Sequence, residues 1–287
     1  MKISTFTVIV GGTACNARCP YCVSKMTPDC GVNKVTEPNW RNFDVACKFA
    51  RDAGTSTALL TGKGEPTLYP NVLGLYVEEL RKHGFPFIEL QTNGIALITE
   101  SWLEHQLKLW HDMGLTTVSI SIAHPDIVRN AEIFRPGKPY DFWGLADKLH
   151  ELGFSVRINC TMVRGYVDNL SDFRFLVARC QDRGIEQLTV REVAMPYDSK
   201  DKEVAKFVEE HEVYGLSGIL HDQLEKAGAT LLLRLPHGGM VYDWYGQNVC
   251  LNNCLTGSTD PDDIRQLIFF PDGHLRYDWR YPGAIIL

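Results

Sequence analysis

The sequence predicts an α/β fold in which helices cover a parallel sheet. Six apolar, strand-like runs alternate with helix-like runs over residues 1–197. This alternation is typical of repeated βα units. A glycine follows most of the helix-like runs, where it can end a helix in the left-handed conformation. Because right-handed crossovers curve a parallel sheet, we expect residues 1–197 to form a partial or full (β/α) barrel.

The expected elements follow one another in order. The strand-like runs are residues 5–10, 57–61, 87–92, 117–122, 155–161 and 187–190. The helix-like runs are residues 36–53, 70–83, 100–113, 140–152 and 169–183. Pro38 stands in the first turn of the first helix, where its missing N–H costs little. A connecting helical segment is expected over residues 198–228, with a break near Gly215.

The last segment, residues 229–287, has a different pattern. Gly, Asn, Asp and aromatic residues are frequent in it. Two apolar runs, residues 267–270 and 275–277, flank a Pro-Asp-Gly-His turn, which predicts a β-hairpin. We therefore expect a small C-terminal appendage that contains a hairpin.

The composition is typical of a soluble globular protein, with 45% hydrophobic and 22% charged residues among 287. The formal net charge of −6 argues against a nucleic-acid partner and suits a neutral or cationic substrate. The first residues lack a signal-peptide pattern, and no run approaches membrane-spanning length. Since the nine cysteines are an odd number, we expect a reducing cytoplasm in which they serve metal binding or chemistry.

Three cysteines lie on one loop directly after the first strand. Cys15, Cys19 and Cys22 have the spacing C-x3-C-x2-C. Thiolate ligands favour an iron–sulfur cluster or zinc. A structural zinc site needs a fourth ligand, and none lies at a zinc-type spacing, since Cys30 is eight residues further on. Three thiolates leave one position of a four-iron cluster open for another group. Zinc binding, or packing as small apolar side chains, is the alternative.

With Tyr21 just before its last cysteine, this loop resembles that of the radical S-adenosylmethionine (SAM) superfamily. The resemblance implies a partial (β/α)6 barrel and a [4Fe-4S] cluster held by Cys15, Cys19 and Cys22. It also implies that SAM binds the open iron, with Tyr21 among the cofactor-binding residues. The reduced cluster would then cleave SAM to a 5′-deoxyadenosyl radical, with an electron donor such as flavodoxin or ferredoxin.

The loop after the second strand resembles the GGEP motif of the same superfamily, with Lys63 in place of the first Gly. Gly64 would allow the backbone to approach the ligand closely, and Glu65 would accept from the ammonium group of SAM. The resemblance implies further SAM contacts from polar residues near the ends of later strands, although each could be a plain cap or ion pair. These residues are Thr92, Asn93, Ser121, Asn159 and Arg191.

Cys250 and Cys254 precede the predicted hairpin, which resembles a reduced auxiliary-cluster extension of radical SAM enzymes. Asp278 stands where that extension has another Cys, so a second Fe–S cluster would need Asp278, Cys30 or some other ligand beside the two cysteines. Alternatively, a free Cys250 donates a hydrogen atom to a substrate radical, because S–H bonds are weaker than most C–H bonds. This would make Cys250 catalytic in an epimerisation. The third interpretation is a buried structural thiol.

The chain length and the placement of the cysteines resemble the radical SAM epimerases of neomycin-type aminoglycoside biosynthesis. This resemblance implies epimerisation at a carbon of an aminoglycoside or sugar. A small, polar, cationic substrate would suit acidic residues of the tail such as Asp272 and Asp278. The competing hypotheses are a radical SAM oxidase or peptide-modifying enzyme with a second cluster, a glycyl-radical activase, and a zinc-binding interaction domain.

Overall fold

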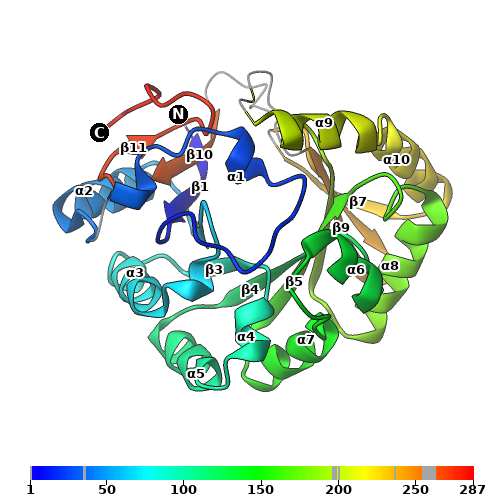
Figure 1. The fold of residues 1–287 in the computed structure, drawn as a ribbon, viewed down its shortest axis with the longest axis horizontal. Coiled ribbons are helices and arrows are strands. Elements are labelled where there is room, and N and C mark those ends of the chain that lie inside the picture. The colour runs from blue at the N-terminus through cyan, green and yellow to red at the C-terminus, as the bar shows by residue number, and fades with distance from the viewer. Residues whose placement is uncertain (1, 35–36, 196–198, 200, 236, 254–262) are drawn as a thin grey trace.

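The computed structural model describes residues 2–34, 37–195, 199, 201–235, 237–253 and 263–287. The described strands form one sheet of eleven, and Figure 1 shows helices around its outer face. The predicted α/β fold, with a parallel sheet and a C-terminal antiparallel hairpin, is confirmed. In the described part of the chain, no helix is long and apolar enough to cross a membrane.

The predicted barrel strands are all present. They are β1 (Lys2–Ile9), β2 (Thr57–Thr61), β3 (Phe87–Thr92), β4 (Thr117–Ile122), β5 (Ser155–Met162) and β6 (Gln187–Glu192). Each pairs in parallel with the next. The C-terminal segment adds β7 (Thr230–Arg234), β8 (Met240–Trp244), β9 (Gln247–Asn253), β10 (Asp263–Phe269) and β11 (Leu275–Arg276).

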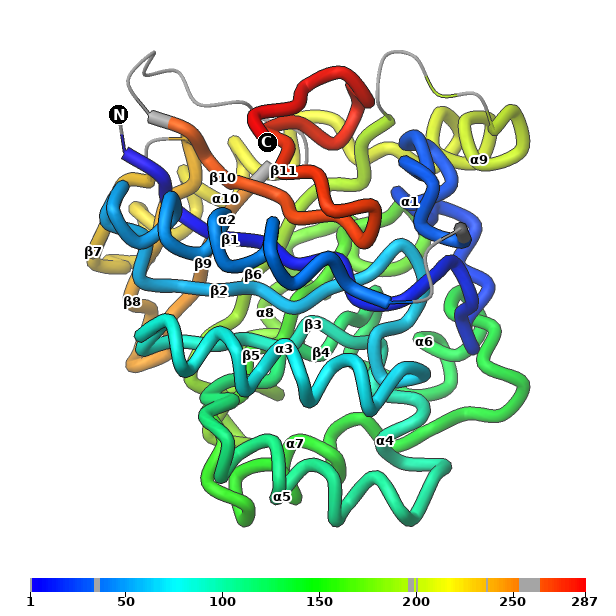
Figure 2. The backbone as a smooth tube through the Cα atoms, turned by 90° about the vertical axis from the view of Figure 1, so that its left-hand side faces the viewer, coloured from blue at the N-terminus to red at the C-terminus, as the bar shows by residue number. Residues whose placement is uncertain are grey.

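The C-terminal strands extend both edges of the sheet. β9 pairs in parallel with β6, and β10 pairs in parallel with β1. In Figure 2, the orange-red β10 lies next to the blue β1. β10 and β11 form the predicted hairpin, with Phe269 opposite Leu275. The complete order is β11-β10-β1-β2-β3-β4-β5-β6-β9-β8-β7. The segment expected as an appendage thus places two parallel strands, one of them carrying Cys250, beside the barrel strands.

Helices connect most of the parallel strands. They are α1 (Val23–Met26), α2 (Trp40–Asp52), α3 (Pro70–Lys82), α4 (Ile95–Thr99), α5 (Leu103–Met113), α6 (Ile127–Phe134), α7 (Phe142–Glu151), α8 (Leu170–Asp182), α9 (Lys202–His211) and α10 (Leu216–Lys226), with 3-10 turns η1 (Val32–Lys34) and η2 (Pro66–Leu68). The expected break in the connecting segment lies between α9 and α10, where Gly215 has a left-handed φ of 74°.

The strands separate an apolar outer face from an inner face. On β4, the side chains of Val118, Ile120 and Ile122 are completely buried in the main hydrophobic core. Ser119 and Ser121 alternate with them and therefore point to the inner face. The same alternation holds in β3, β5 and β6, because the parallel register keeps paired residues on one face. We call the space on this inner face of the parallel strands the lumen.

Candidate functional site

The loop that carries the three predicted metal ligands, residues 10–22, lies across the carboxyl ends of several strands (Figure 1). We call it the cysteine loop. The backbone N–H of Glu65, after β2, donates to the carbonyl oxygen of Ala14 at 2.9 Å. Asn93 Nδ2, after β3, donates to Asn16 Oδ1 at 2.8 Å. The backbone N–H of Arg18 donates to the carbonyl oxygen of Phe134 at 2.8 Å. The loop is thus fastened at three separate points.

The three thiols of this loop affect one another. Cys15 is exposed, whereas Cys19 and Cys22 are half-buried. Burial raises the pKa values of Cys15 and Cys19, and the negative charge of neighbouring thiolates raises them further. Because their thiolates repel one another, ionising all three together requires a cationic centre between them, which a cluster provides. Within the described residues, no three His, Cys, Asp or Glu side chains are arranged to hold a single metal ion.

Gly64 lies where the cysteine loop meets the loop after β2. A Cβ atom at this position would lie 2.1 Å from the carbonyl oxygen of Ala14, much closer than atoms can approach. Glycine is therefore required for the two loops to touch, whatever else binds there. The structure shows a close approach of Gly64 to the backbone of the cysteine loop, and its predicted approach to the ligand stays a prediction.

Glu65 is buried and accepts hydrogen bonds from four groups of the chain itself. Oε1 accepts from the hydroxyl of Thr92 at 2.6 Å and from the hydroxyl and the N–H of Thr67. Oε2 accepts from the backbone N–H of Asn93 at 2.9 Å. Burial raises the pKa of Glu65, while these bonds lower it in part. Glu65 therefore fixes Asn93, whose Nδ2 also lies 3.7 Å from Cys15 Sγ. The predicted contact of Glu65 with SAM stays a prediction.

Lys63, which replaces a Gly of the motif, is only 4% exposed. Its Nζ donates to Thr27 Oγ1 at 2.5 Å and lies 5.4 Å from the ring centroid of Trp279. Burial lowers the pKa of Lys63 to about 8, although negative charge at Cys30 and Cys22 opposes the change. Lys63 therefore links the region after the cysteine loop to the C-terminal tail.

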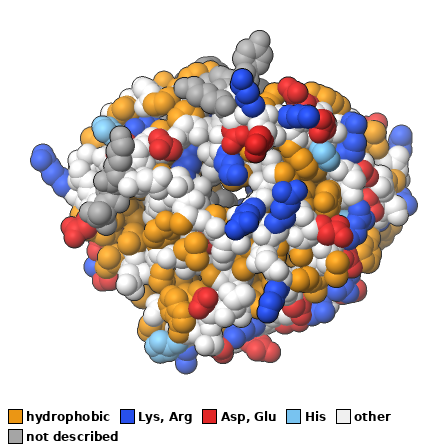
Figure 3. All heavy atoms as spheres, in the orientation of Figure 1, with side chains coloured by type: hydrophobic (Ala, Val, Ile, Leu, Met, Phe, Trp, Pro, Cys, Tyr) orange, Lys and Arg blue, Asp and Glu red, His pale blue; other side chains and the backbone are white. Residues whose placement is uncertain are grey.

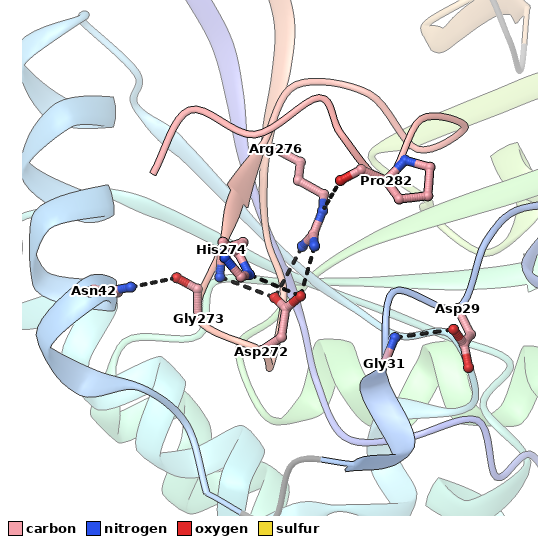
Figure 4. A network of polar contacts seen from close by, with 8 residues as sticks. All are labelled: Asp29, Gly31, Asn42, Asp272, Gly273, His274, Arg276 and Pro282. Carbon is pink, nitrogen blue, oxygen red and sulfur yellow. Dashed lines mark hydrogen bonds and ion pairs between the residues drawn. The ribbon is translucent and has the colours of Figure 1, made fainter.

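Two acidic residues of the tail, Asp272 and Asp278, already have cationic partners. Figure 4 shows both carboxylate oxygens of Asp272 bonded to Arg276, at 3.0 and 2.7 Å. Burial raises the pKa of Asp272, but the bonds from Arg276 and His274 outweigh it, and the pKa lies below its ordinary value. Asp278 is bonded to Arg280 at 3.1 Å. Neither carboxylate is free to hold a cationic substrate. Cys254, the other predicted auxiliary ligand, lies outside the described residues.

The strand register brings several predicted residues together on the lumen wall. Ser121 on β4 lies opposite Asn159 on β5, which lies opposite Thr189 on β6, which lies opposite Cys250 on β9. Register partners in parallel strands point to the same face. Arg191, two residues beyond Thr189, also faces the lumen and donates from Nε to Asn159 Oδ1 at 3.0 Å. These residues form one continuous polar surface.

Cys250 is 4% exposed on this wall. Burial raises the pKa of its thiol above the ordinary value, although the charges of Arg157, Arg191 and Arg265 act in the opposite direction. A raised pKa keeps the sulfur protonated at neutral pH. The S–H form, which hydrogen-atom donation needs, is therefore the stable one.

Two other predicted residues have different surroundings. Thr92 lies on the outer face of β3, in register with Ile120, where its hydroxyl donates to Glu65. The ring of Tyr21 packs edge-on against Phe134, with centroids 6.5 Å apart, and burial raises its pKa well above the ordinary value. Both residues support the cysteine loop and its neighbours in this structure, and their predicted contacts with SAM are not tested by it.

Sequence analysis missed a polar network deeper in the lumen. Glu89 on β3 is buried, and its carboxylate lies 3.0 Å from Arg157 Nη1 on β5. Gln91 Nε2 donates to Glu89 Oε1 at 3.0 Å. Ser119, the register partner of Arg157, is completely buried. The sequence pattern that could have revealed this network is the alternation of these polar residues with the apolar residues of their strands.

Comparison with known proteins identifies related chains. The family described as "Radical SAM superfamily" matches residues 9–180. The human "Molybdenum cofactor biosynthesis protein 1" is 30% identical over 221 residues, which are 74% of this chain but only 32% of that protein. An "S-adenosylmethionine-dependent nucleotide dehydratase" of Thermoplasmatales archaeon (strain ISO4-H5) is 27% identical over 236 residues, covering 80% of this chain and 79% of that protein.

The fold is similar to that of a solved structure. Streptococcus suis SuiB, bound to precursor peptide SuiA, superposes with a TM-score of 0.61 at 15% sequence identity. The match covers 96% of this chain and 59% of that chain. At this level of identity the likeness shows the fold alone.

Proposed function

Because the chain belongs to the radical SAM superfamily, we propose that it epimerises a carbon of a small polar substrate bound in the lumen, with Cys250 as the hydrogen donor. Its cofactors are a [4Fe-4S] cluster and SAM, which when bound supply the 5′-deoxyadenosyl radical that removes a hydrogen atom from the substrate. A reductant of the flavodoxin or ferredoxin class would supply the electron.

The chain's own residues fit these cofactors. Cys15, Cys19 and Cys22 would hold three irons of the cluster. Hydrogen bonds to residues after β2, after β3 and at the end of α6 keep their loop in place. Asn93 lies close to Cys15 and would help to orient the loop. Ser121 and Asn159, on the lumen wall, would contact SAM.

The observation that carries the proposal is the position of Cys250. It lies on the lumen wall in the same row as Asn159, and burial keeps its thiol protonated. Its S–H bond would break as a new C–H bond forms on the substrate radical, leaving a thiyl radical on Cys250. One electron from the external reductant and one proton from solvent would restore the thiol. Delivery to the face opposite the abstraction inverts the carbon.

The test is turnover in D2O. Sugars, aminoglycosides and nucleotides are first screened for compounds that raise 5′-deoxyadenosine formation above the substrate-free background. With such a compound, the wild type should place one solvent deuterium at the inverted carbon. Cys250→Ala should still form 5′-deoxyadenosine without epimer. Cys160→Ala is the matched control, since Cys160 lies next to Asn159 but faces the core. Full epimerisation by Cys250→Ala would exclude the donor role.

A second candidate is an enzyme that acts on a nucleotide. The observation favouring it is the similarity, over 80% of this chain, to a relative named as a nucleotide dehydratase. The same screen separates the two candidates by product mass. An epimer has the mass of its substrate, whereas a dehydrated nucleotide has lost one water. A mass loss with unchanged activity in Cys250→Ala would select the dehydratase candidate.

A second cluster in the C-terminal segment is the remaining alternative, with an oxidase or peptide-modifying function. Iron content distinguishes it. If the chain binds one cluster, the wild type should contain about four irons per chain and a Cys15/Cys19/Cys22 triple-Ala variant should contain none. A second cluster would give about eight, with about four surviving in the variant. Zinc in place of iron would select the interaction-domain hypothesis.

A further inference from the structure

The charged side chains at lumen-facing positions are mostly cationic. Arg157 lies two residues before Asn159 on β5, and Arg191 lies two residues after Thr189 on β6, so both face the lumen. On the eight described parallel strands, the register places only one acidic side chain at such a position, Glu89. The two arginines therefore give this wall a net positive charge around Cys250.

Neither arginine is fully occupied by other groups. Arg157 is paired through Nη1 with Glu89, yet its side chain keeps 28% of its surface accessible. Its Nε makes no hydrogen bond within the described residues. Arg191 donates from Nε to Asn159 Oδ1, and among the described residues its terminal nitrogens make no hydrogen bond. Both side chains can therefore still donate to a ligand.

A third observation points to the same place. Ser119, the register partner of Arg157, is completely buried, and its hydroxyl has no hydrogen-bond partner in the described part of the chain. Figure 3 shows a hollow near the middle of the face that carries the cysteine loop, with Lys and Arg side chains at its edge and acidic side chains close by.

We propose that the substrate carries an oxyanion, a phosphate or a carboxylate, which binds between Arg157 and Arg191 beside Cys250. The planar guanidinium group is well suited to paired bonds with such an oxyanion. The proposal rests on the proposed function in taking the lumen as the substrate site. It argues against the polycationic substrate expected from the sequence, because an ammonium group would meet two arginines while Asp272 and Asp278 are already paired.

The first experiment measures pyrophosphate and acetate binding to the cluster-reconstituted protein by calorimetry, with and without SAM. We expect binding in the presence of saturating SAM and a loss of about tenfold or more in Arg157→Gln. Tighter binding of pyrophosphate selects a phosphate group, and tighter binding of acetate selects a carboxylate. If both anions instead compete with SAM, the arginines serve the carboxylate of the cofactor, and the proposal is overturned.

A substitution at Glu89 should change anion binding in the opposite direction from Arg157→Gln. Glu89→Gln removes the carboxylate that pairs with Arg157, so anion binding should tighten several-fold. Arg183→Gln, which breaks a pair with Asp147 outside the lumen, matches the charge change of Arg157→Gln and should bind as the wild type does. If Glu89→Gln and Arg157→Gln weaken binding equally, the network is only structural and the proposal fails.

The outcome is separable from that of the proposed function. Cys250→Ala should bind the anions as the wild type does, because its sulfur is not a ligand for them. Anion binding without epimerisation would refute the hydrogen-donor role and keep the oxyanion site. Epimerisation of a substrate without an anionic group would refute the oxyanion site and keep the donor role.

Discussion

The two sides of the lumen differ in what fills them. Beside β1 and β10, the inward-facing Ile9, Ile268 and Phe270 are completely buried and pack with Val32, with Trp279 against them. Along β4, β5, β6 and β9, the corresponding positions carry Ser, Asn, Thr, Arg and Cys. The strand pattern is the same on both sides. The chain thus fills one side with its own side chains and leaves polar groups on the other, which is where a ligand would bind.

The largest effect on stability should come from the apolar side. We expect Phe270→Ala to lower the free energy of unfolding by about 3–5 kcal/mol, because it leaves a cavity among completely buried side chains. Urea unfolding at neutral pH measures this change. Leu232→Ala is a control, since Leu232 is 53% exposed and should change stability little. A loss below about 1 kcal/mol for Phe270→Ala would show that this side is as loosely filled as the other.

Lys63, which lies next to Trp279 of the apolar side, should make the stability of the protein depend on pH. Its pKa is lowered to about 8 in the folded protein from an ordinary 10.5, because it is buried. Between these values the unfolded chain binds more protons, so stability should rise as the pH rises from about 8 to 10.5. The gain is at most about 3 kcal/mol.

The measurement compares the wild type with Lys63→Met in the cluster-free protein. The difference in the free energy of unfolding is taken at several pH values, so that titration of other groups cancels. The advantage of Lys63→Met should be largest below pH 8 and should shrink toward pH 10.5. A constant difference across this range would mean that the ammonium group is effectively solvated, and that the tail does not exclude water from it.

The sequence predicted the barrel strands and the C-terminal hairpin, but it missed other elements. Strands β2 and β3 have the predicted bounds, because short apolar runs between Gly-rich turns have few alternatives. Helix α6 was missed, since it is short and follows His-Pro-Asp, which is typical of a loop. Strand β9 was missed because its partner β6 is about 60 residues away, and no local pattern shows that pairing.

The candidate site divides in the same way. The cysteine loop was singled out by the spacing of its cysteines, and the Gly64-Glu65 motif by its resemblance to a motif of the superfamily. The pairing of two tail carboxylates was not predictable, because the bonds of Asp272 to Arg276 and of Asp278 to Arg280 depend on a turn conformation. The Glu89–Arg157 pair joins residues that are 68 positions apart. Only the register of the sheet brings them together.

The smallest effect should come from Ser119, on the polar side. Its hydroxyl is buried without a hydrogen-bond partner in the described part of the chain. Ser119→Ala therefore removes no hydrogen bond that stabilises the folded protein. We expect the free energy of unfolding to change by less than about 0.5 kcal/mol or to rise slightly. The same urea titration as for Phe270→Ala measures it, and Thr189→Ala, one row above on β6, serves as a neighbouring control.

A loss of more than about 1 kcal/mol would mean that an ordered water or the protein itself satisfies the hydroxyl. Ser119 would then belong to the structural network of Glu89. A neutral result together with weakened pyrophosphate binding would place it in the oxyanion site, and would confirm that the two sides of the lumen are built for different purposes.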